Sequence, residues 1–411
     1  MPQATANRVA VLYVPETEIG VTPTPQPIFQ RLRTTGDELT AGATFITSDE
    51  ITENRLVSDT IQTEASSGGT ISGELSYGTY DDFLAALLGS DWVVEVTEDV
   101  ENLSITVEGT GANKTYTLVR TAGRFTTTTY EEGTIIHIKS HANLEDDNFY
   151  AIIGDEKTAT EMKIHPFKPI TAVAADSTAR GLTRLSYIRN GPLDKSFTIQ
   201  KHYQDLDPNV YWFFRGARVA GLELELATGS ILTSVFNFEV QADSVSNDSG
   251  GQLVPRSPNN NGVLNAVNNV ASILRDNNPD LEQTFFSSLS ISMDNNLRRQ
   301  LAIGQLDAIG IAAGRLSLTG SIEYYFNNRR LIDDFKAARE YSLNFILNDT
   351  ADVATGGNTL IISMPRIKNE TLSIPTTGID TDVFASADIQ ALGKGAGTEA
   401  YSLQISRRSA D

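Results

Sequence analysis

The sequence predicts a mainly β protein made of two tandem β-modules, each with a flanking α-helix, and a small inserted β-domain. Three observations predict this fold. Apolar and polar residues alternate along much of the chain, as in strands with one buried face. Residues 71–88 and 316–339 share one order: an alternating strand with a glycine, an aromatic turn, and a short helix that contains Asp-Asp-Phe. Residues 93–185 instead show short strands with frequent glycine turns, typical of a small barrel or sandwich.

These patterns set the domain boundaries. The first module is discontinuous and comprises residues 1–92 and 186–256. The insert comprises residues 93–185, and the second module comprises residues 257–411.

Composition excludes several classes of protein. The 411 residues include no cysteine, which excludes disulfides and thiolate chemistry. The net charge of −20 argues against wrapping nucleic acid through its phosphates, which requires a basic surface. No apolar run approaches the length of a membrane helix, about 18 residues, so we expect no membrane partner. The first residues lack the basic segment followed by an apolar segment that is typical of a secretion signal, so we expect no secretion.

The first module begins with a strand at 9–14 and a proline-rich extended arm at 22–27. Residues 51–69 are polar and predict a long loop. A strand follows at 71–77, and then a helix that ends at Gly89. We expect the helix to be capped by Thr79 and to place Asp81 and Asp82 in its first turn, where the helix dipole favours negative charge.

The rest of the first module contains long strands. The aromatic run 210–216 predicts a short helix, and 221–226 and 231–241 predict strands. In the first of these strands Glu223 and Glu225 share one face, opposite a row of leucines. Residues 243–262 are rich in Ser, Asn, Gly and Pro and predict a linker.

The second module repeats the order of the first. A strand at 288–293 leads into a long loop at 294–314, and then come the repeated strand and a helix with Asp333 and Asp334 at its start. Two last strands are expected at 341–347 and 360–364, followed by a flexible glycine-rich tail that includes 393–398.

Candidate chemistry is sparse. The four histidines are His137, His141, His165 and His202, and none has the spacing of a metal site. The pair Asp146 and Asp147 predicts a solvated turn, and no nucleophile elbow, zinc motif or phosphate loop is present. We therefore expect no enzyme activity and no cofactor.

At the strand and helix of 71–88, ISGELSYGTYDDFLAALL, the chain resembles the tail tube proteins of long-tailed, siphophage-type bacteriophages. The DNNLRR loop and GRLSLTG strand of the second half resemble them too. The resemblance covers 50–92 and about 186–365, and is weaker over the insert.

The resemblance implies a β-sandwich or half-barrel subunit that closes into rings, which stack into a hollow tube for the viral genome. Its motifs are structural and not catalytic. It implies assembly in the bacterial cytoplasm and a place in the virion tail. The implied partners are other copies of the chain, a tape measure protein in the lumen, and terminator and distal tail proteins at the ends, with DNA present only in passage.

Two sets of residues are candidates for contact sites in such a tube. An acidic lumen would let DNA slide without sticking, and the candidates to line it are Glu74, Glu223, Glu225 and Glu323. The two long loops are candidates for contacts between stacked rings, through Asn54, Arg55, Asp59, Asn296, Arg298 and Arg299.

The duplication predicts a ring of three chains with pseudo-sixfold symmetry, with a ring of six chains as the alternative. The insert is expected to face outward. The alternatives for function are another ring-forming tail component, such as a terminator or baseplate hub protein, a β-domain surface adhesin, and a polysaccharide-active enzyme.

Overall fold

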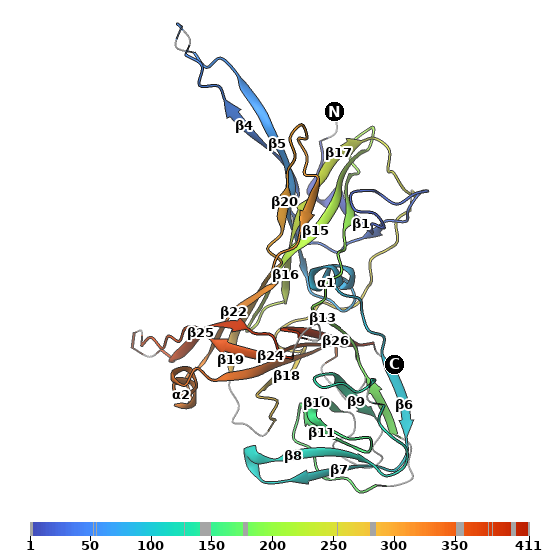
Figure 1. The fold of residues 1–411 in the computed structure, drawn as a ribbon, viewed down its shortest axis with the longest axis vertical. Helices are drawn as coiled ribbons and strands as arrows, with labels where there is room; N and C mark the ends of the chain where they lie inside the picture. Colours follow the sequence, from blue (N-terminus) through green and yellow to red (C-terminus); the bar gives the residue numbers. More distant parts are fainter. Residues whose placement is uncertain are drawn as a thin grey trace.

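The computed structural model has one large antiparallel sheet system and a separate seven-stranded sheet (Figure 1). The chain is therefore mainly β, as predicted. The structure describes residues 3–51, 53–54, 56–126, 128–139, 149–175, 180–252, 254–279, 285–350, 357–376, 378–379, 381–395 and 400–409.

Two ladders of strands make up the large system. In the first, neighbours pair in the order β1 (Val9–Pro15), β14 (Phe197–Tyr203), β15 (Val210–Ala227), β16 (Thr233–Val240), β5 (Thr60–Glu74) and β4 (Thr40–Thr47). Strand β17 (Ala242–Ser246) runs beside the first half of β15. The short strands β2 (Gln30–Arg31) and β3 (Gly36–Asp37) pair with β1 and β5.

In the second ladder, neighbours pair in the order β18 (Val270–Arg275), β23 (Glu340–Asn348), β24 (Thr359–Asn369), β25 (Phe384–Ala391), β22 (Ser317–Tyr325) and β19 (Phe286–Asp294). Strand β26 (Gln404–Arg408) runs beside the first half of β24 and also pairs with β13 (Ser186–Arg189). The two ladders are joined where the second half of β15 pairs with β19.

The aromatic run 210–216 is the first half of β15, so the predicted helix there is wrong. Strands β14 and β17 flank this half of β15 on its two edges. Tyr211, Phe213 and Phe214 are all buried, so both faces of the strand are covered. A strand covered on both faces loses the alternation by which it is recognised, and aromatic residues favour strands when they pack in this way.

The predicted loop 51–69 is also wrong in its second half, because residues 60–69 belong to β5. With β4 they form a hairpin that extends away from the rest of the molecule (Figure 1). All eight residues of β4 are exposed. The hairpin is therefore held by backbone pairing and not by burial, which is why its sequence carries no apolar alternation.

Two further boundaries differ from the expectation. The predicted linker 243–262 begins inside β17, and the part of the chain after 364 contains β25 and β26 in place of a flexible tail. Of the tail segment 393–398, residues 396–398 lie outside the described residues.

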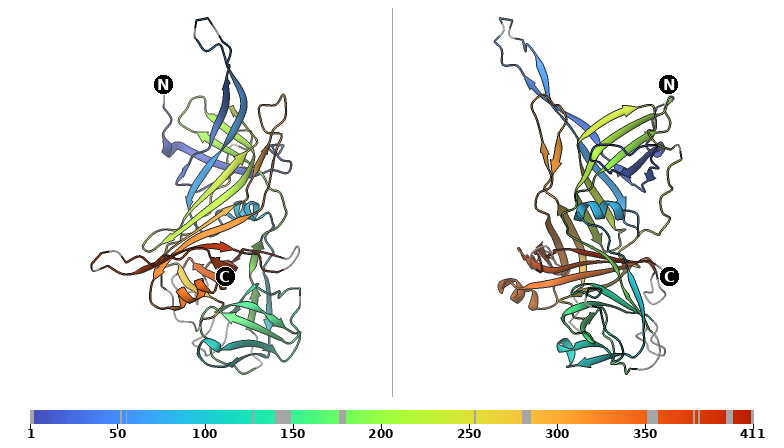
Figure 2. Two further views of the ribbon diagram at one scale, coloured as in Figure 1. Left: turned by 60° about the vertical axis from the view of Figure 1, so that its left-hand side comes forward. Right: turned by 45° about the vertical axis from the view of Figure 1, so that its right-hand side comes forward.

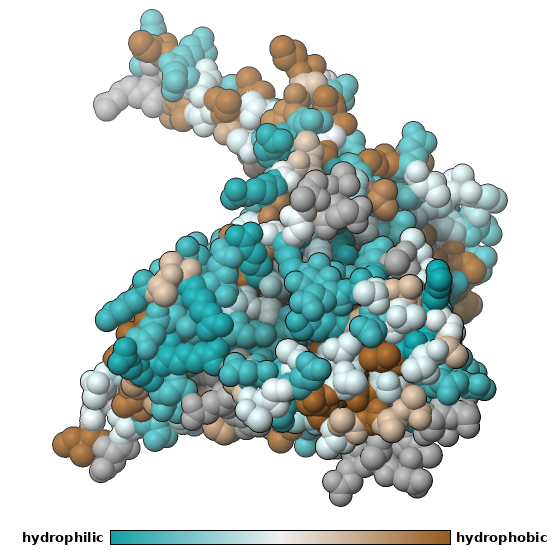
Figure 3. Space-filling model, turned by 60° about the horizontal axis from the view of Figure 1, so that its bottom comes forward, coloured by the Kyte–Doolittle hydropathy of each residue, from teal (hydrophilic) through white to brown (hydrophobic). Residues whose placement is uncertain are grey.

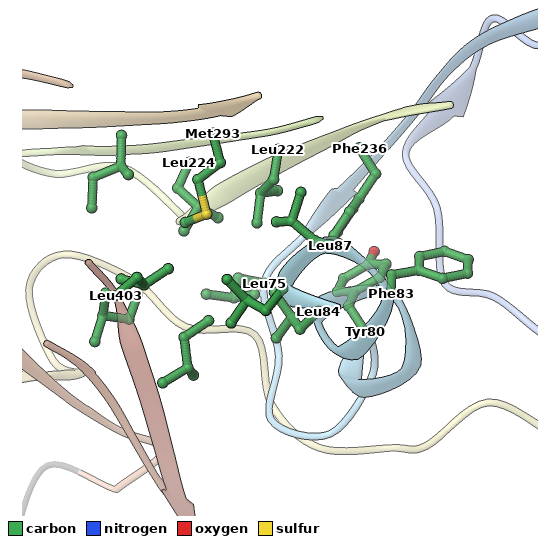
Figure 4. Packing of buried hydrophobic residues seen from close by; sticks show 14 of the residues in the cluster. Leu75, Tyr80, Phe83, Leu84, Leu87, Leu222, Leu224, Phe236, Met293 and Leu403 are labelled. Carbon is green, nitrogen blue, oxygen red and sulfur yellow. The ribbon is translucent and has the colours of Figure 1, made fainter. Parts of the chain in front are cut away.

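The main core is centred on α1 (Asp81–Leu88), which packs against β15 and, through Phe83, against β16 (Figure 4). Phe83 is 1% exposed, and its ring lies 4.9 to 5.5 Å from those of Tyr13, Phe197, Phe236 and Phe238. Gly89 ends the helix in a left-handed conformation (φ 58°), as predicted. The second helix, α2 (Arg330–Lys336), is less enclosed and buries only Leu331 and Asp334.

The seven-stranded sheet has a core of its own, which includes Leu118, Ile136 and Met162. Its strands, in spatial order, are β6 (Val96–Val100), β12 (Arg180–Arg184), β9 (Ile135–Lys139), β10 (Phe149–Lys157), β11 (Glu161–Pro166), β8 (Thr115–Arg120) and β7 (Leu103–Glu108). A third apolar cluster joins it to β18, β23 and β24. The Tyr150 and Thr359 hydroxyls also lie 2.8 Å apart across this contact.

Two short 3-10 turns complete the fold, Ala6–Arg8 and Gly111–Asn113. A second, smaller hairpin of β20 (Arg298–Gln300) and β21 (Gly310–Ala312) lies within the predicted loop 294–314. It points toward the same end of the molecule as the β4–β5 hairpin (Figure 2).

Candidate functional site: a polar sheet face and two projecting hairpins

Six neighbouring strands present one continuous polar face. Residues directly opposite each other in a ladder project from the same face of the sheet, so the registers define rows across it. One row runs through Glu74, Thr233, Glu225, Ser290, Ser321 and Asp388. The next runs through Ser72, Val235, Glu223, Ser292, Thr319 and Gln390. A shorter third row runs through Ala227, Ser288, Glu323 and Ser386.

All four glutamates predicted as lumen candidates lie on this face. Glu223 and Glu225 are exposed, and Glu74 and Glu323 are partly exposed. Ser287 donates a hydrogen bond to Glu323 Oε2 at 2.6 Å. Asp388 was not among the predicted residues, because no strand was predicted at the position of β25.

These three rows hold five carboxylates, and none of their positions is a lysine or an arginine. Lys368 stands one strand further on, opposite Gln390. The opposite face packs into the main core through Leu222, Leu224, Ile291 and Ile322. The sheet therefore has one apolar, buried face and one acidic face.

The two hairpins expose apolar side chains at one end of the molecule. Figure 3 shows hydrophobic residues on both projections. Large apolar residues with more than 45% of their surface exposed are Phe45, Ile46, Ile51, Leu56, Val57 and Ile61 on the first, and Leu301, Ile303, Leu306 and Ile309 on the second. Exposed apolar residues gathered in this way mark an interaction surface.

The predicted inter-ring residues differ in their surroundings. Asn54 and Asp59 are exposed in the turn of the first hairpin, and Arg55 lies outside the described residues. Arg298 is exposed on β20. Asn296 is exposed, but its side chain donates to the Arg315 carbonyl at 2.9 Å and shapes the turn.

Arg299 is a correction, because its guanidinium is committed within the chain. It donates to the carbonyl oxygens of Ala65, Ser67 and Val240 at 2.7, 3.4 and 3.2 Å. It also lies 3.5 Å from a carboxylate oxygen of Glu64. It therefore anchors the second hairpin to the base of the first and is not free to reach another ring.

The expected cap of the first helix is also a correction. Tyr80, not Thr79, is the N-cap residue of α1, and no side chain caps the helix. The Thr79 hydroxyl instead bonds Ser76 and Asn259, at 2.5 and 3.0 Å. The aromatic Tyr80 is held at this position because it is 2% exposed and its hydroxyl donates to the Arg33 carbonyl at 2.5 Å.

Asp81 and Asp82 lie in the first turn of α1 and also tie it to other segments. Asp82 accepts a hydrogen bond from the Tyr13 hydroxyl at 2.9 Å. Burial, and secondly the Asp82 charge, raises the pKa of Tyr13. Asp81 forms an ion pair with Arg407 of β26, whose guanidinium lies 4.1 Å from the Trp92 ring centre.

The second Asp-Asp pair stands elsewhere in its helix. Because α2 begins at Arg330, Asp333 falls at the end of its first turn, where it pairs with Arg329 at 2.8 Å. Asp334 follows and is nearly buried, with Arg275 at 2.7 Å and Arg339 at 3.3 Å. The role expected for Asp334 at the helix start is therefore wrong, and it acts as an anion in an arginine cluster.

Little in the structure points to catalysis. In the described ranges, no group of three or more His, Asp or Glu side chains could hold a metal ion. His137 packs on the Tyr150 ring at 4.7 Å, and His202 stacks on Tyr211 at 4.3 Å. Burial lowers the pKa of His165 and His202. His141, Asp146 and Asp147 lie outside the described residues.

Comparison with known proteins identifies the family. None of the helices in the described ranges is long and apolar enough to cross a membrane. No curated protein matches the chain. A family model described as phage tail tube protein matches residues 6–391, nearly the whole chain. The chain therefore belongs to the phage tail tube protein family, whose members are structural components of the virion tail.

Proposed function

We propose that this chain polymerises as stacked rings into a hollow tail tube, of siphophage type, through which genomic DNA passes into the host. The observation that carries the proposal is the acidic face over six strands, opposite a mainly apolar, buried one. A sheet that curves around a channel needs such a two-sided chemistry.

The two ladders support a duplicated module. Both have the same order of pairing, with an extra strand beside the first half of the third member. Both also carry a bulge at the same place. The register shifts between Phe197–Ala217 and Ile199–Phe214 in one, and between Tyr341–Ile367 and Leu343–Met364 in the other. In both ladders the shift sets one residue of one strand against two of its neighbour. The same irregularity at the same place supports two copies of one module.

Two modules in a chain favour a ring of three chains with pseudo-sixfold symmetry. The β15–β19 pairing already joins the two modules edge to edge within a chain. Repeating that junction between chains gives a closed ring without new chemistry. A ring of six chains remains the alternative.

The acidic face is proposed to line the lumen. Carboxylates repel phosphates, and a face without cations offers no counter-ion release on which DNA could bind. Glu74, Glu223, Glu225, Glu323 and Asp388 are the residues concerned.

The two hairpins are proposed to contact the next ring. They extend from one end of the molecule, and their exposed apolar residues would be covered by a neighbouring subunit. Asn54, Arg55, Asp59, Asn296 and Arg298 are the candidates for polar contacts.

The seven-stranded sheet is proposed to be an inserted domain that faces outward. Its two connections run side by side, because the Val93 N–H donates to the Tyr187 carbonyl at 2.8 Å. It packs on Ile346 and Ile361, which do not belong to the main core cluster. A domain attached there lies away from the acidic face of the central strands.

The proposed partners follow from the tube. They are further copies of the chain, a tape measure protein in the lumen, and terminator and distal tail proteins at the two ends. Assembly would take place in the host cytoplasm. We propose no cofactor and no enzyme activity.

Electron microscopy tests the proposal. The chain is expressed, concentrated and imaged by negative stain, and hollow tubes of uniform width are expected. Single rings that never stack would favour a terminator or baseplate component. Soluble monomers at every concentration would contradict the proposed function.

A further inference from the structure

Two edges of the large sheet are open in a single chain. On the first, β4 pairs with β5 on one side only. The Glu38 N–H donates to the Thr70 carbonyl at 2.8 Å. Because donors alternate along a strand, the N–H groups of Leu39 and Ala41 point away from β5. In the described residues no second strand pairs on this edge, and the Leu39 carbonyl there accepts one hydrogen bond, from Lys201 Nζ at 3.5 Å. Strand β4, with all eight residues exposed, is therefore a site for pairing with another chain.

The second open edge lies just after β24. Residues 370–376 continue its direction beside β25, because Ser373 exchanges two backbone hydrogen bonds of 2.8 Å with Ser386. The N–H groups of Leu372 and Ile374 therefore point to the other side. In the described ranges no backbone hydrogen bond is found on that side of 370–376.

The duplicated module shows what belongs on these edges. Strands β16 and β25 have eight residues each, and each begins opposite the last residue of its neighbour, Glu74 or Tyr325. Their third residues, Val235 and Ser386, pair with Glu223 and Ser373. Glu223 and Ser373 are therefore equivalent positions.

Counting residues from the strand ends in the same way gives the equivalent positions for the edge at β4. Gly68 and Thr319 each stand six residues before the end of their strands, β5 and β22, and pair with Thr40 and Ser292. Thr40 and Ser292 are therefore equivalent. Within the chain, Glu223 pairs directly with Ser292, as the third pair of a seven-pair ladder from Gly221–Asp294 to Ala227–Ser288.

We propose that residues 371–376 of one copy pair antiparallel with residues 37–42 of the next copy, with Ser373 opposite Thr40. The inference rests on the proposed tube function and names the surface that closes its rings. The partner is a second copy of this chain, because the β15–β19 junction supplies a template for both sides of the contact. The two edges differ, so the contact is head-to-tail, the kind of contact that forms a ring when its rotation closes.

Side-chain burial fits this register. Leu222 and Leu224, covered by β19, are 0% and 8% exposed. Their equivalents, Leu372 and Ile374, already pack on the core but are only half-buried. Pro375 is compatible with this pairing. Because it stands two residues after Ser373, its backbone faces β25 as that of Ser373 does. The missing N–H of the proline therefore removes no donor from the open edge.

Engineered cysteines test the register in a chain that has none of its own. The Asn295 N–H donates to the Ala220 carbonyl, and the Thr228 N–H donates to the Ser287 carbonyl. Because hydrogen-bonded and non-hydrogen-bonded pairs alternate along an antiparallel ladder, Glu223–Ser292 is a non-hydrogen-bonded pair. Such Cα atoms lie about 4.5 Å apart, which suits a disulfide. The variant T40C/S373C is therefore oxidised after assembly, with E223C/S292C as the matched pair inside one chain.

The expected result for T40C/S373C is a ladder of covalent dimers and closed trimers on a non-reducing gel. The control pair is expected to give an intrachain disulfide and no ladder. The variant E38C/S373C, displaced by two residues on the same face at an exposed position, is expected to give at least tenfold less cross-linked product. A stronger product from this displaced pair would overturn the register.

A backbone substitution gives an independent readout. A41P removes a donor on the open edge but none that faces β5, so it is expected to leave a folded monomer that assembles at least tenfold less well. A41S keeps the N–H and is the matched control. Tubes that form from T40C/S373C without any interchain disulfide, or from A41P as readily as from A41S, would overturn the edge pairing and leave the proposed function standing. A chain that never forms rings or tubes would overturn both.

Discussion

The guanidinium of Arg299 in β20 donates a hydrogen bond of 2.7 Å to the carbonyl oxygen of Ala65 in β5. The Ala65 N–H in turn donates to the Leu306 carbonyl at 3.0 Å, so β5 is joined both to a strand and to the connecting loop of the second hairpin. Glu239 lies 3.8 Å from the same guanidinium. The pKa of Glu239 is raised, because burial outweighs the opposing effect of the Arg299 charge. The Arg299 side chain and this backbone bond therefore hold the two hairpins together.

Replacing Arg299 is expected to destabilise the subunit itself. R299A leaves the Ala65 and Val240 carbonyls and Glu64 without their cation, and should lower the free energy of unfolding by about 2–4 kcal/mol. Arg298 is the matched control, because it is exposed on the same strand. R298A should change the free energy by no more than about 0.5 kcal/mol. Urea unfolding of dilute monomers measures both, and equal losses would contradict the assignment of Arg299 as an anchor.

Reversing the charge of the acidic face should make tubes bind DNA. Glu74, Glu223, Glu225 and Glu323 changed together to Lys raise the charge of each subunit by 8, because each substitution adds 2. Short duplex DNA added during assembly is then expected to sediment with the tubes, with an affinity that falls steeply with salt. The control carries the same change on exposed residues of the seven-stranded sheet, Asp99, Glu101, Glu108 and Asp155. DNA held inside control tubes as tightly as in the variant would contradict a lumen position.

Tyr80 should make stability fall in alkali. Burial raises the pKa of its hydroxyl to about 12, from 10.0 in the unfolded chain. The neutral phenol is the form that the fold stabilises, so this contribution is complete below pH 10 and is lost as pH rises toward 12. A shift of this size corresponds to about 2–3 kcal/mol.

The measurement is urea unfolding at intervals from pH 9 to 12. Other buried tyrosines have a raised pKa too, among them Tyr130 and Tyr341, so the wild-type slope is a sum. Y80F should be less stable at pH 9, because it loses the hydrogen bond to Arg33, and should show a shallower fall above pH 10. An unchanged slope would show that Tyr80 does not titrate in this range.

Removing the seven-stranded sheet should leave assembly intact. Residues 94–185 can be replaced by a short glycine linker, because Val93 and Tyr187 are adjacent backbone partners. Ile346 and Ile361 pack against the removed part and should be changed to Thr, which keeps β-branching and makes the newly exposed face polar. Tubes of smaller outer diameter and unchanged bore are expected by electron microscopy. Loss of tubes, with the shortened chain still folded, would place the sheet in the ring wall.

The alternating segments were predictable from sequence because alternation reports one buried and one exposed face. Glu223 and Glu225 were assigned to one face of a strand for this reason, and the registers add that Glu74 and Glu323 share that face. Which strands are neighbours depends on contacts far apart in sequence. The row from Glu74 to Asp388 could therefore not be read from the chain alone.

The segments predicted wrongly are those where burial does not alternate. The first half of β15 is covered on both faces, and the outer part of the β4–β5 hairpin is covered on neither. Arg298 and Arg299 look alike in sequence, and only the neighbouring carbonyls of β5 and β16 distinguish them. A repeated motif likewise does not fix where its residues stand in a helix. Asp333 and Asp334 repeat Asp81 and Asp82 in sequence, but α2 begins at Arg330, before them.

The two Phe residues of the repeated Asp-Asp-Phe motif should therefore differ in how much they contribute to the free energy of unfolding. Phe83 is 1% exposed and meets four aromatic rings, so F83A should lower the free energy of unfolding by about 3–5 kcal/mol through the cavity it leaves. Phe335 is only partly buried on α2, so F335A should cost about 1–2 kcal/mol. Urea unfolding of dilute monomers compares the two variants. The control is Y325F, an aromatic substitution at an exposed position. A larger loss for F335A would mean that the second helix, and not α1, organises the core, because the cost of the same substitution rises with the cavity that remains.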